Sequence, residues 1–108
     1  METVKRNLPE LRYLYFYVKK TKRAEYVKYA SSEFIETLWQ IGLNLVFSNK
    51  NNIKLRKKDL TLLRKTRLGL KCLIRSESAK DRRSSLTNAV LDVLLSVFVP
   101  WIAKNKLA

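Results

Sequence analysis

Apolar residues recur at helical spacing along almost the whole of this chain. In the segment 9–19, for example, Leu11, Leu14 and Val18 follow the i, i+3, i+7 spacing that places side chains on one face of an α-helix. Only two glycines and two prolines interrupt the 108 residues. The pattern therefore predicts an all-α protein, a compact bundle of five to six short helices with an apolar helix at its C-terminal end.

The length is that of one ordinary domain, so residues 1–108 are expected to form a single basic helical domain. Its four segments are a basic segment at 1–30, a core helix at 31–48, a basic amphipathic helix at 54–75 and an apolar C-terminal helix at 86–103. The opening residues METVKRNLPE are polar and charged, which does not fit a secretory signal. We therefore expect an intracellular protein.

The charge is strongly one-sided, because 23 lysines and arginines face 9 acidic residues and give a net charge of +14. Solubility of a small domain needs a net charge of only about 2 to 8. The excess predicts an anionic partner, and three classes fit: nucleic acid, an anionic membrane surface or an acidic protein.

The composition argues against an enzyme. The chain has no histidine, which excludes His-based acid/base catalysis and His-containing zinc sites, and Cys72 is the only cysteine. Glu33 and Glu36 form the only close acidic pair in the core helix, and helix capping accounts for both. We predict no catalytic residue, no metal site and no cofactor.

The segment 54–75 carries the main candidate site. At about 100° per residue its leucines fall on one arc and its cations on the roughly opposite arc, with Asp59 and Leu68 as exceptions to the pattern. Such a row of cations suits the phosphates of nucleic acid. The predicted nucleic-acid-binding residues are Lys54, Lys57, Lys58, Arg64, Lys65, Lys71 and Arg75, extended by Arg82 and Arg83.

Two further features lie in the basic segment 1–30. Lys19, Lys20, Lys22 and Arg23 form a short cationic run typical of a nuclear-import patch. The aromatic cluster 13–17 beside it has the composition of a platform for single-stranded nucleic acid, although packing of these rings in the core is the favoured interpretation.

The segment 86–103 is open to a second interpretation. Its apolar face could pack in the core, bind a partner or self-associate, and Trp101 at its end suits a membrane interface. The residues expected to act in membrane or partner binding are Val93, Leu94, Val97, Phe98 and Trp101.

Three stretches together resemble a known family. They are ASSEFIE at 30–36 leading to LNLV at 43–46, IKL at 53–55 before the charged stretch 63–73, and the apolar end 91–100. In this order and spacing the chain resembles a small basic protein of Polinton (Maverick) elements and their adintovirus relatives. Arg82 and Arg83 resemble that family's "K-K-R" patch, whereas Lys54 replaces its usual proline and the paired glycines before the tail are missing.

The resemblance implies a virion-associated or replication-associated protein, because the family's genes lie beside capsid and packaging genes. The layout is similar to that of the small adenovirus core protein precursor. Together with the charge, it leads us to expect a non-enzymatic, sequence-nonspecific DNA-condensing protein of a virus-like mobile element, located in the host nucleus or the virion. The alternatives are a membrane-active or capsid-docking minor virion protein, and an adaptor that self-associates through 86–103.

Overall fold

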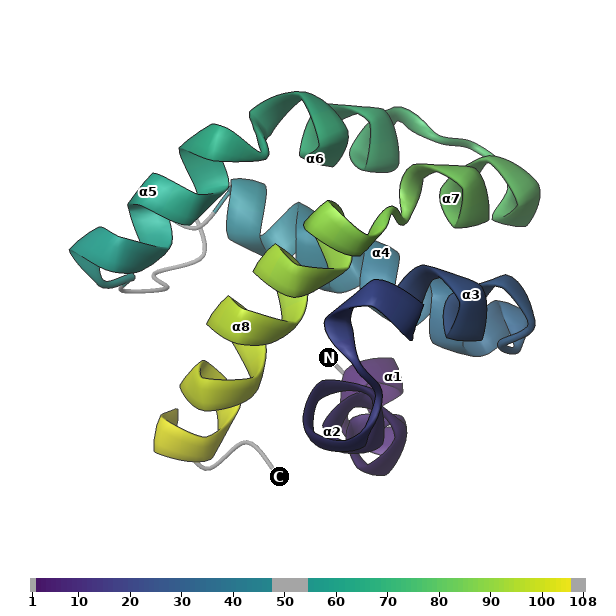
Figure 1. Ribbon diagram of the computed structural model, residues 1–108, viewed down its shortest axis with the longest axis horizontal. Helices are drawn as coiled ribbons and strands as arrows, with labels where there is room; N and C mark the ends of the chain where they lie inside the picture. Colours follow the sequence, from purple (N-terminus) through teal and green to yellow (C-terminus); the bar gives the residue numbers. More distant parts are fainter. Residues whose placement is uncertain (1, 48–54, 106–108) are drawn as a thin grey trace.

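Helix α4 (Ser32–Val46) crosses the middle of the molecule and supplies much of its core (Figure 1). The helix begins after Ser31, whose side-chain oxygen accepts a hydrogen bond from the Phe34 backbone N–H at 3.1 Å. This cap satisfies one of the N–H groups that a helix start leaves unpaired. The buried residues of α4 are Phe34, Ile35, Thr37, Leu38, Ile41, Gly42 and Leu45.

The computed structural model describes residues 2–47 and 55–105, and within these ranges all regular structure is helical. The other elements are α1 (Glu2–Arg6), α2 (Leu8–Tyr17), a 3-10 helix η1 (Lys20–Lys22), α3 (Arg23–Lys28), α5 (Lys57–Lys65), α6 (Arg67–Arg75), α7 (Ala79–Ser85) and α8 (Asn88–Asn105). The described residues thus contain eight α-helices, against the five or six expected. The difference arises because α1 was not expected and because one expected helix is divided in two.

The divided helix is the one predicted over 54–75. It ends as α5 at Lys65 and resumes as α6 at Arg67, and Thr66 between them has φ −107° and ψ 16°. The Thr66 hydroxyl donates to the Leu62 carbonyl at 3.0 Å. A threonine whose hydroxyl donates to the carbonyl four residues earlier tends to bend a helix. The apolar periodicity of the sequence therefore continues through Thr66, although the helix axis changes direction there.

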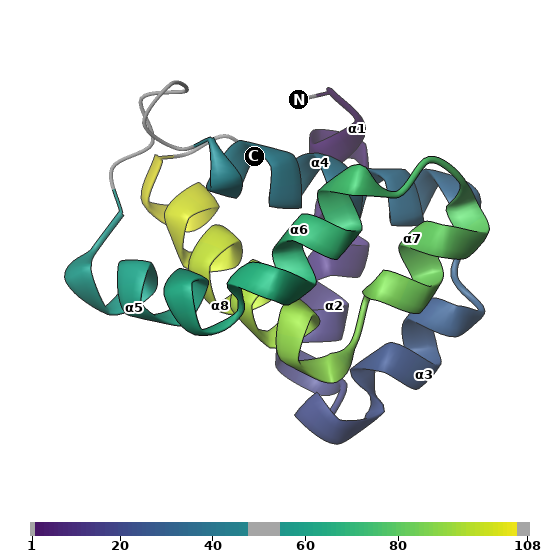
Figure 2. The same cartoon turned by 90° about the horizontal axis from the view of Figure 1, so that it is seen from above.

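The elements form two sides around α4 and α8. Figure 1 shows α5, α6 and α7 along one side of the molecule and α1 and α2 along the opposite side. Seen from above in Figure 2, α6 lies over α4 and α2. The two sides are joined by one core of buried residues drawn from α1, α2, α3, α4, α6 and α8.

Helix α8 is oriented by a narrow polar strip along its length. Asn88 accepts a hydrogen bond from the Ala24 backbone N–H at 2.8 Å and donates to the Thr21 carbonyl at 3.2 Å. One turn further on lies Asp92, which accepts a hydrogen bond from Ser96 at 3.2 Å. The strip therefore faces η1 and α3, and the apolar remainder of the helix is turned into the core.

This orientation corrects one expectation for the segment 86–103. The residues proposed for membrane or partner binding are interior in this structure: Val93, Leu94, Val97 and Phe98 are buried, and Trp101 is half-buried. The helix continues through Pro100. Because these side chains fill the core, they are not displayed to a bilayer or a partner in this conformation.

No single helix in the part of the chain described is long and apolar enough to cross a bilayer. Helices α7 and α8 reach the required length and composition only as a pair, and they meet at a bend of 89°.

Candidate nucleic-acid interface

The first turn of α5 is held by a buried acid at its start. The Asp59 carboxylate accepts hydrogen bonds from the Arg56 backbone N–H and from its Nε, both at 3.2 Å. Asp59 is only 5% exposed. The acid that interrupts the apolar arc in sequence is therefore a helix cap that neutralises one neighbouring arginine.

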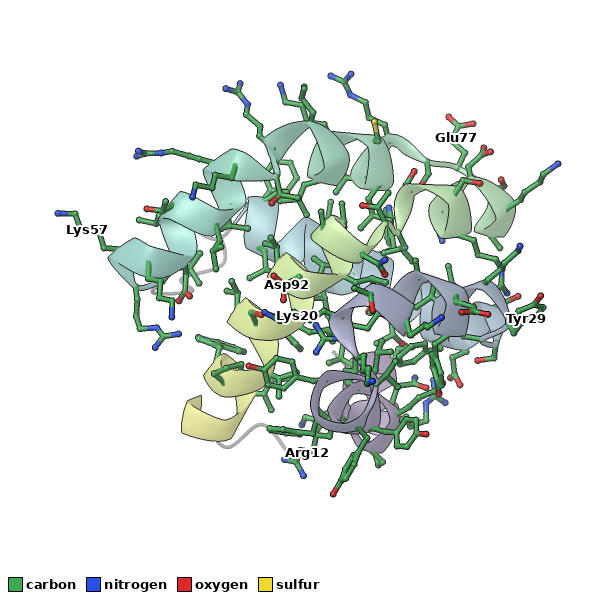
Figure 3. The ribbon with its side chains drawn as sticks, viewed as in Figure 1. Arg12, Lys20, Tyr29, Lys57, Glu77 and Asp92 are labelled. Carbon is green, nitrogen blue, oxygen red and sulfur yellow. The ribbon has the colours of Figure 1, made fainter. Side chains whose placement is uncertain are left out.

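The remaining cations of α5 and α6 lie on the side of the molecule that these two helices form. We call them the basic face, and Figure 3 shows nitrogen-tipped side chains projecting outward along both helices, with Lys57 at the far end. Its members are Lys57, Lys58, Arg64, Lys65, Arg67, Lys71 and Arg75. Lys71 is half-buried and the other six are exposed.

The charge of the basic face is not compensated locally. Residues 55–75 contain eight cations and one acid, and that acid, Asp59, is already paired with Arg56. Among the described residues, none of the seven members forms an ion pair with an acidic side chain. Seven positive charges therefore face solvent on one side of the molecule.

The break at Thr66 gives this face a hollow. An open depression of about 560 Å³ lies where α5, α6 and the start of α8 meet. Its lining includes Arg64, Lys65, Arg67 and Lys71. Four cations around one concave surface concentrate positive potential there, which favours an anion over water as its occupant.

Only some of the predicted binding residues lie on the basic face. Of the predicted set, the six cations of 57–75 lie on the basic face, whereas Lys54 lies outside the described residues. Arg67 belongs to the basic face but was missed. In one uninterrupted helix it falls beside Ile74, seven residues away, at the edge of the apolar arc, and the break at Thr66 removes that constraint.

Arg82 and Arg83 have structural contacts of their own. The Arg83 guanidinium donates to the carbonyls of Val27, Lys28 and Ala30 at 3.1, 3.3 and 2.6 Å, which ties α7 to the end of α3. The Arg82 guanidinium lies 4.3 Å above the ring of Trp39, on α4. Both arginines are half-buried, so neither extends the basic face as a free phosphate ligand.

The four cations of the expected nuclear-import patch differ in exposure. Lys19, Lys20 and Lys22 are exposed, but Arg23 is only 3% exposed. Its guanidinium donates to the Leu14 and Tyr15 carbonyls at 3.2 and 2.8 Å. Arg23 is therefore a core residue and does not belong to the exposed patch.

Comparison with models of known protein families, with curated proteins and with solved structures gives no match. The resemblance to the small basic protein of Polinton elements therefore rests on the sequence motifs alone.

Proposed function

We propose that this protein binds nucleic acid through the phosphates, with the basic face of α5 and α6 as its contact surface, and that it catalyses no reaction. The observation that supports the proposal is the set of seven uncompensated cations on one side of the molecule. Each lysine or arginine that meets a phosphate releases a condensed counterion, and this release drives binding to a polyanion.

The exposed arginines and lysines of this face suit phosphates, and only part of the set of side chains that reads bases is present. Asparagine and glutamine, which recognise adenine through two hydrogen bonds, are absent from residues 55–75. The helices α5 and α6 have nine residues each and meet at a bend, so neither presents a long straight surface to a groove. We therefore propose binding that depends little on sequence and serves to neutralise or condense duplex DNA.

The cellular setting is proposed from the resemblance alone. A basic condensing protein of a virus-like mobile element would act in the host nucleus or in the virion. The alternatives that act through 86–103, capsid docking, membrane activity and self-association, lose support because four of the five side chains that they require are buried and Trp101 is half-buried.

The test is a titration of two unrelated labelled duplexes at about 50 and 200 mM salt. Seven phosphate contacts predict a loss of roughly 10³- to 10⁴-fold in affinity over this range, equal for both sequences. A shallow salt dependence, or a strong preference for one duplex, would overturn the proposal.

Paired variants locate the surface. Arg67→Gln removes one contact and is expected to lower the slope of log affinity against log salt by about 0.9. Lys5→Gln makes the same charge change at an exposed position on α1, away from the basic face, and is expected to leave the slope nearly unchanged. Equal effects of the two substitutions would show that net charge, rather than this face, governs binding.

A further inference from the structure

Helix α2 exposes an unusual amount of aromatic surface. Tyr13, Phe16 and Tyr17 are 50%, 65% and 79% exposed, although packing in the core was the favoured interpretation of this cluster. Their spacing of three and four residues places them on one face of the helix. Large rings that a small protein leaves in water at one place commonly mark a binding surface.

The rings are ordered against one another rather than scattered. The ring of Tyr17 stacks on that of Tyr13, with centroids 5.8 Å apart and planes inclined by 24°. Tyr13 in turn lies 5.9 Å from Tyr26 of α3. We call these three residues the tyrosine row; its outer end is the exposed ring of Tyr17.

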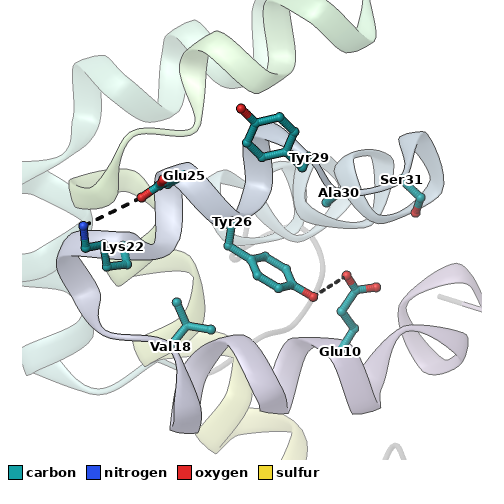
Figure 4. A pocket seen from close by; sticks show the side chains of 8 residues that line it. All are labelled: Glu10, Val18, Lys22, Glu25, Tyr26, Tyr29, Ala30 and Ser31. Carbon is teal, nitrogen blue, oxygen red and sulfur yellow. Dashed lines mark hydrogen bonds and ion pairs between the residues drawn. The ribbon is translucent and has the colours of Figure 1, made fainter.

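The inner end of the row is fixed. The Tyr26 hydroxyl donates to the Glu10 carboxylate at 2.8 Å across the gap between α3 and α2, as Figure 4 shows. Its ring packs edge-on against buried Phe34, with centroids 6.4 Å apart. The row is therefore preorganised, and a ligand that stacks on Tyr17 need not order the rings beneath it.

Cations flank the row, and the nearby acids are occupied. Arg12 is exposed and projects from α2 in Figure 3, one residue before Tyr13 and four before Phe16. Lys19 is exposed just beyond the end of α2. Of the acids beside the row, Glu10 accepts from Tyr26 and Glu25 pairs with Lys22 at 3.8 Å.

We infer that this surface binds single-stranded nucleic acid, with unpaired bases stacking on Tyr17 and Phe16 and phosphates meeting Arg12 and Lys19. Aromatic rings beside cations form sequence-tolerant platforms for unpaired bases, because every base has a flat face that can stack. A base pair inside a duplex cannot offer that face. The site lies on the side of the molecule opposite α5 and α6, so it does not depend on the basic face (Figure 1).

The test compares single-stranded oligothymidine with a duplex of equal length, by fluorescence anisotropy at low salt. Tyr17→Ala is expected to weaken binding of the single strand by roughly 5- to 150-fold, the range for loss of one stacked base, and to leave duplex affinity unchanged. Tyr17→Phe keeps the ring and is expected to keep the affinity. Tyr29→Ala is the matched control, since Tyr29 is 81% exposed and has no ring neighbour among the described residues.

Three results would overturn the inference: no binding of the single strand by the unmodified protein, no loss with Tyr17→Ala, or an equal loss with Tyr29→Ala. A loss seen only on vesicles with anionic lipids would assign the rings to a membrane and overturn it too. Arg67→Gln separates this inference from the proposed function, because that substitution is expected to act on duplex binding while Tyr17→Ala acts on the single strand.

Discussion

Arg23 and Asp92 lie 3.5 Å apart, guanidinium to carboxylate, and join α3 to α8 across 69 residues of sequence. The Arg23 side chain is 4% exposed and that of Asp92 is 30% exposed. Asp92 is the one acid in the segment 84–108, and Arg23 also holds two carbonyls at the end of α2. The pair therefore fixes the rotation of α8 about its axis, and with it the choice of which face enters the core.

Removal of either partner is expected to destabilise the fold. Arg23→Met leaves two carbonyls without their donor, and Asp92→Asn leaves a buried guanidinium without its counter-charge. Each should lower the free energy of unfolding by about 1–3 kcal/mol, and the double variant should cost less than the sum. Urea denaturation measures all three. Lys20→Met is the control, because Lys20 pairs with the same carboxylate at 3.6 Å from an exposed position and should cost about 1 kcal/mol or less.

The sequence pattern and the structure assign different roles to Arg83, and a substitution can distinguish them. The pattern assigns it to phosphates, whereas its guanidinium caps three carbonyls at the end of α3. Arg83→Gln should therefore lower the free energy of unfolding by about 1.5–3 kcal/mol and leave the salt slope of DNA binding within error. Denaturation and the duplex titration read the two effects separately. A slope lowered by about 0.9 with unchanged stability would return Arg83 to the interface.

Local signals predicted the features that depend on neighbours in sequence. Ser31 and Ser78 lie three residues before Phe34 and Asp81, whose backbone N–H groups donate to the two serine side chains. The two exceptions in the amphipathic helix predicted at 54–75 also follow from the pattern: Leu68, on the cationic arc, is 78% exposed, and Asp59, on the leucine arc, is buried. Apolar periodicity and helix capping involve residues within one or two helical turns of one another, so they can be predicted from a single sequence.

Contacts between distant segments could not be predicted in this way. Arg23 lies in a run of cations and gives no local sign that its partner is Asp92 on the last helix. The exposure of Tyr13 and Tyr17 is equally a tertiary outcome, because α2 turns its leucines, rather than these rings, toward the core. The set of residues in the candidate site changed for this reason. The position of a cation on the polar side of a predicted helix does not show whether its side chain is free or donates to a carbonyl from a distant segment.

Gly69 lies at a close approach of α6 to α8. A Cβ added there would lie 2.6 Å from the Cγ2 atom of Val90, which is far inside van der Waals contact. Gly69→Ala should therefore lower the free energy of unfolding by about 1–3 kcal/mol even though alanine is the better helix former. The same change at Gly42 meets the end of the flexible Leu73 side chain at 2.9 Å and should cost less. Thermal denaturation of the two variants tests the order, and a smaller loss at Gly69 would contradict this packing.

Tyr26 predicts a change of stability at alkaline pH. Burial, together with the hydrogen bond to the Glu10 carboxylate and its negative charge, raises the pKa of Tyr26 from 10.0 to about 12. Because the folded state holds this proton more tightly than the unfolded state, the contribution of Tyr26 to stability is complete below pH 10. It is lost as the pH rises toward 12. Absorbance of tyrosinate should show a late ionisation step near pH 12, and Tyr26→Phe should remove that step. The stability change is measured as the difference between the unmodified protein and Tyr26→Phe, because other pH effects are common to both; this difference should shrink between pH 10 and 12. A constant difference across this range would show that folding does not raise the pKa of Tyr26.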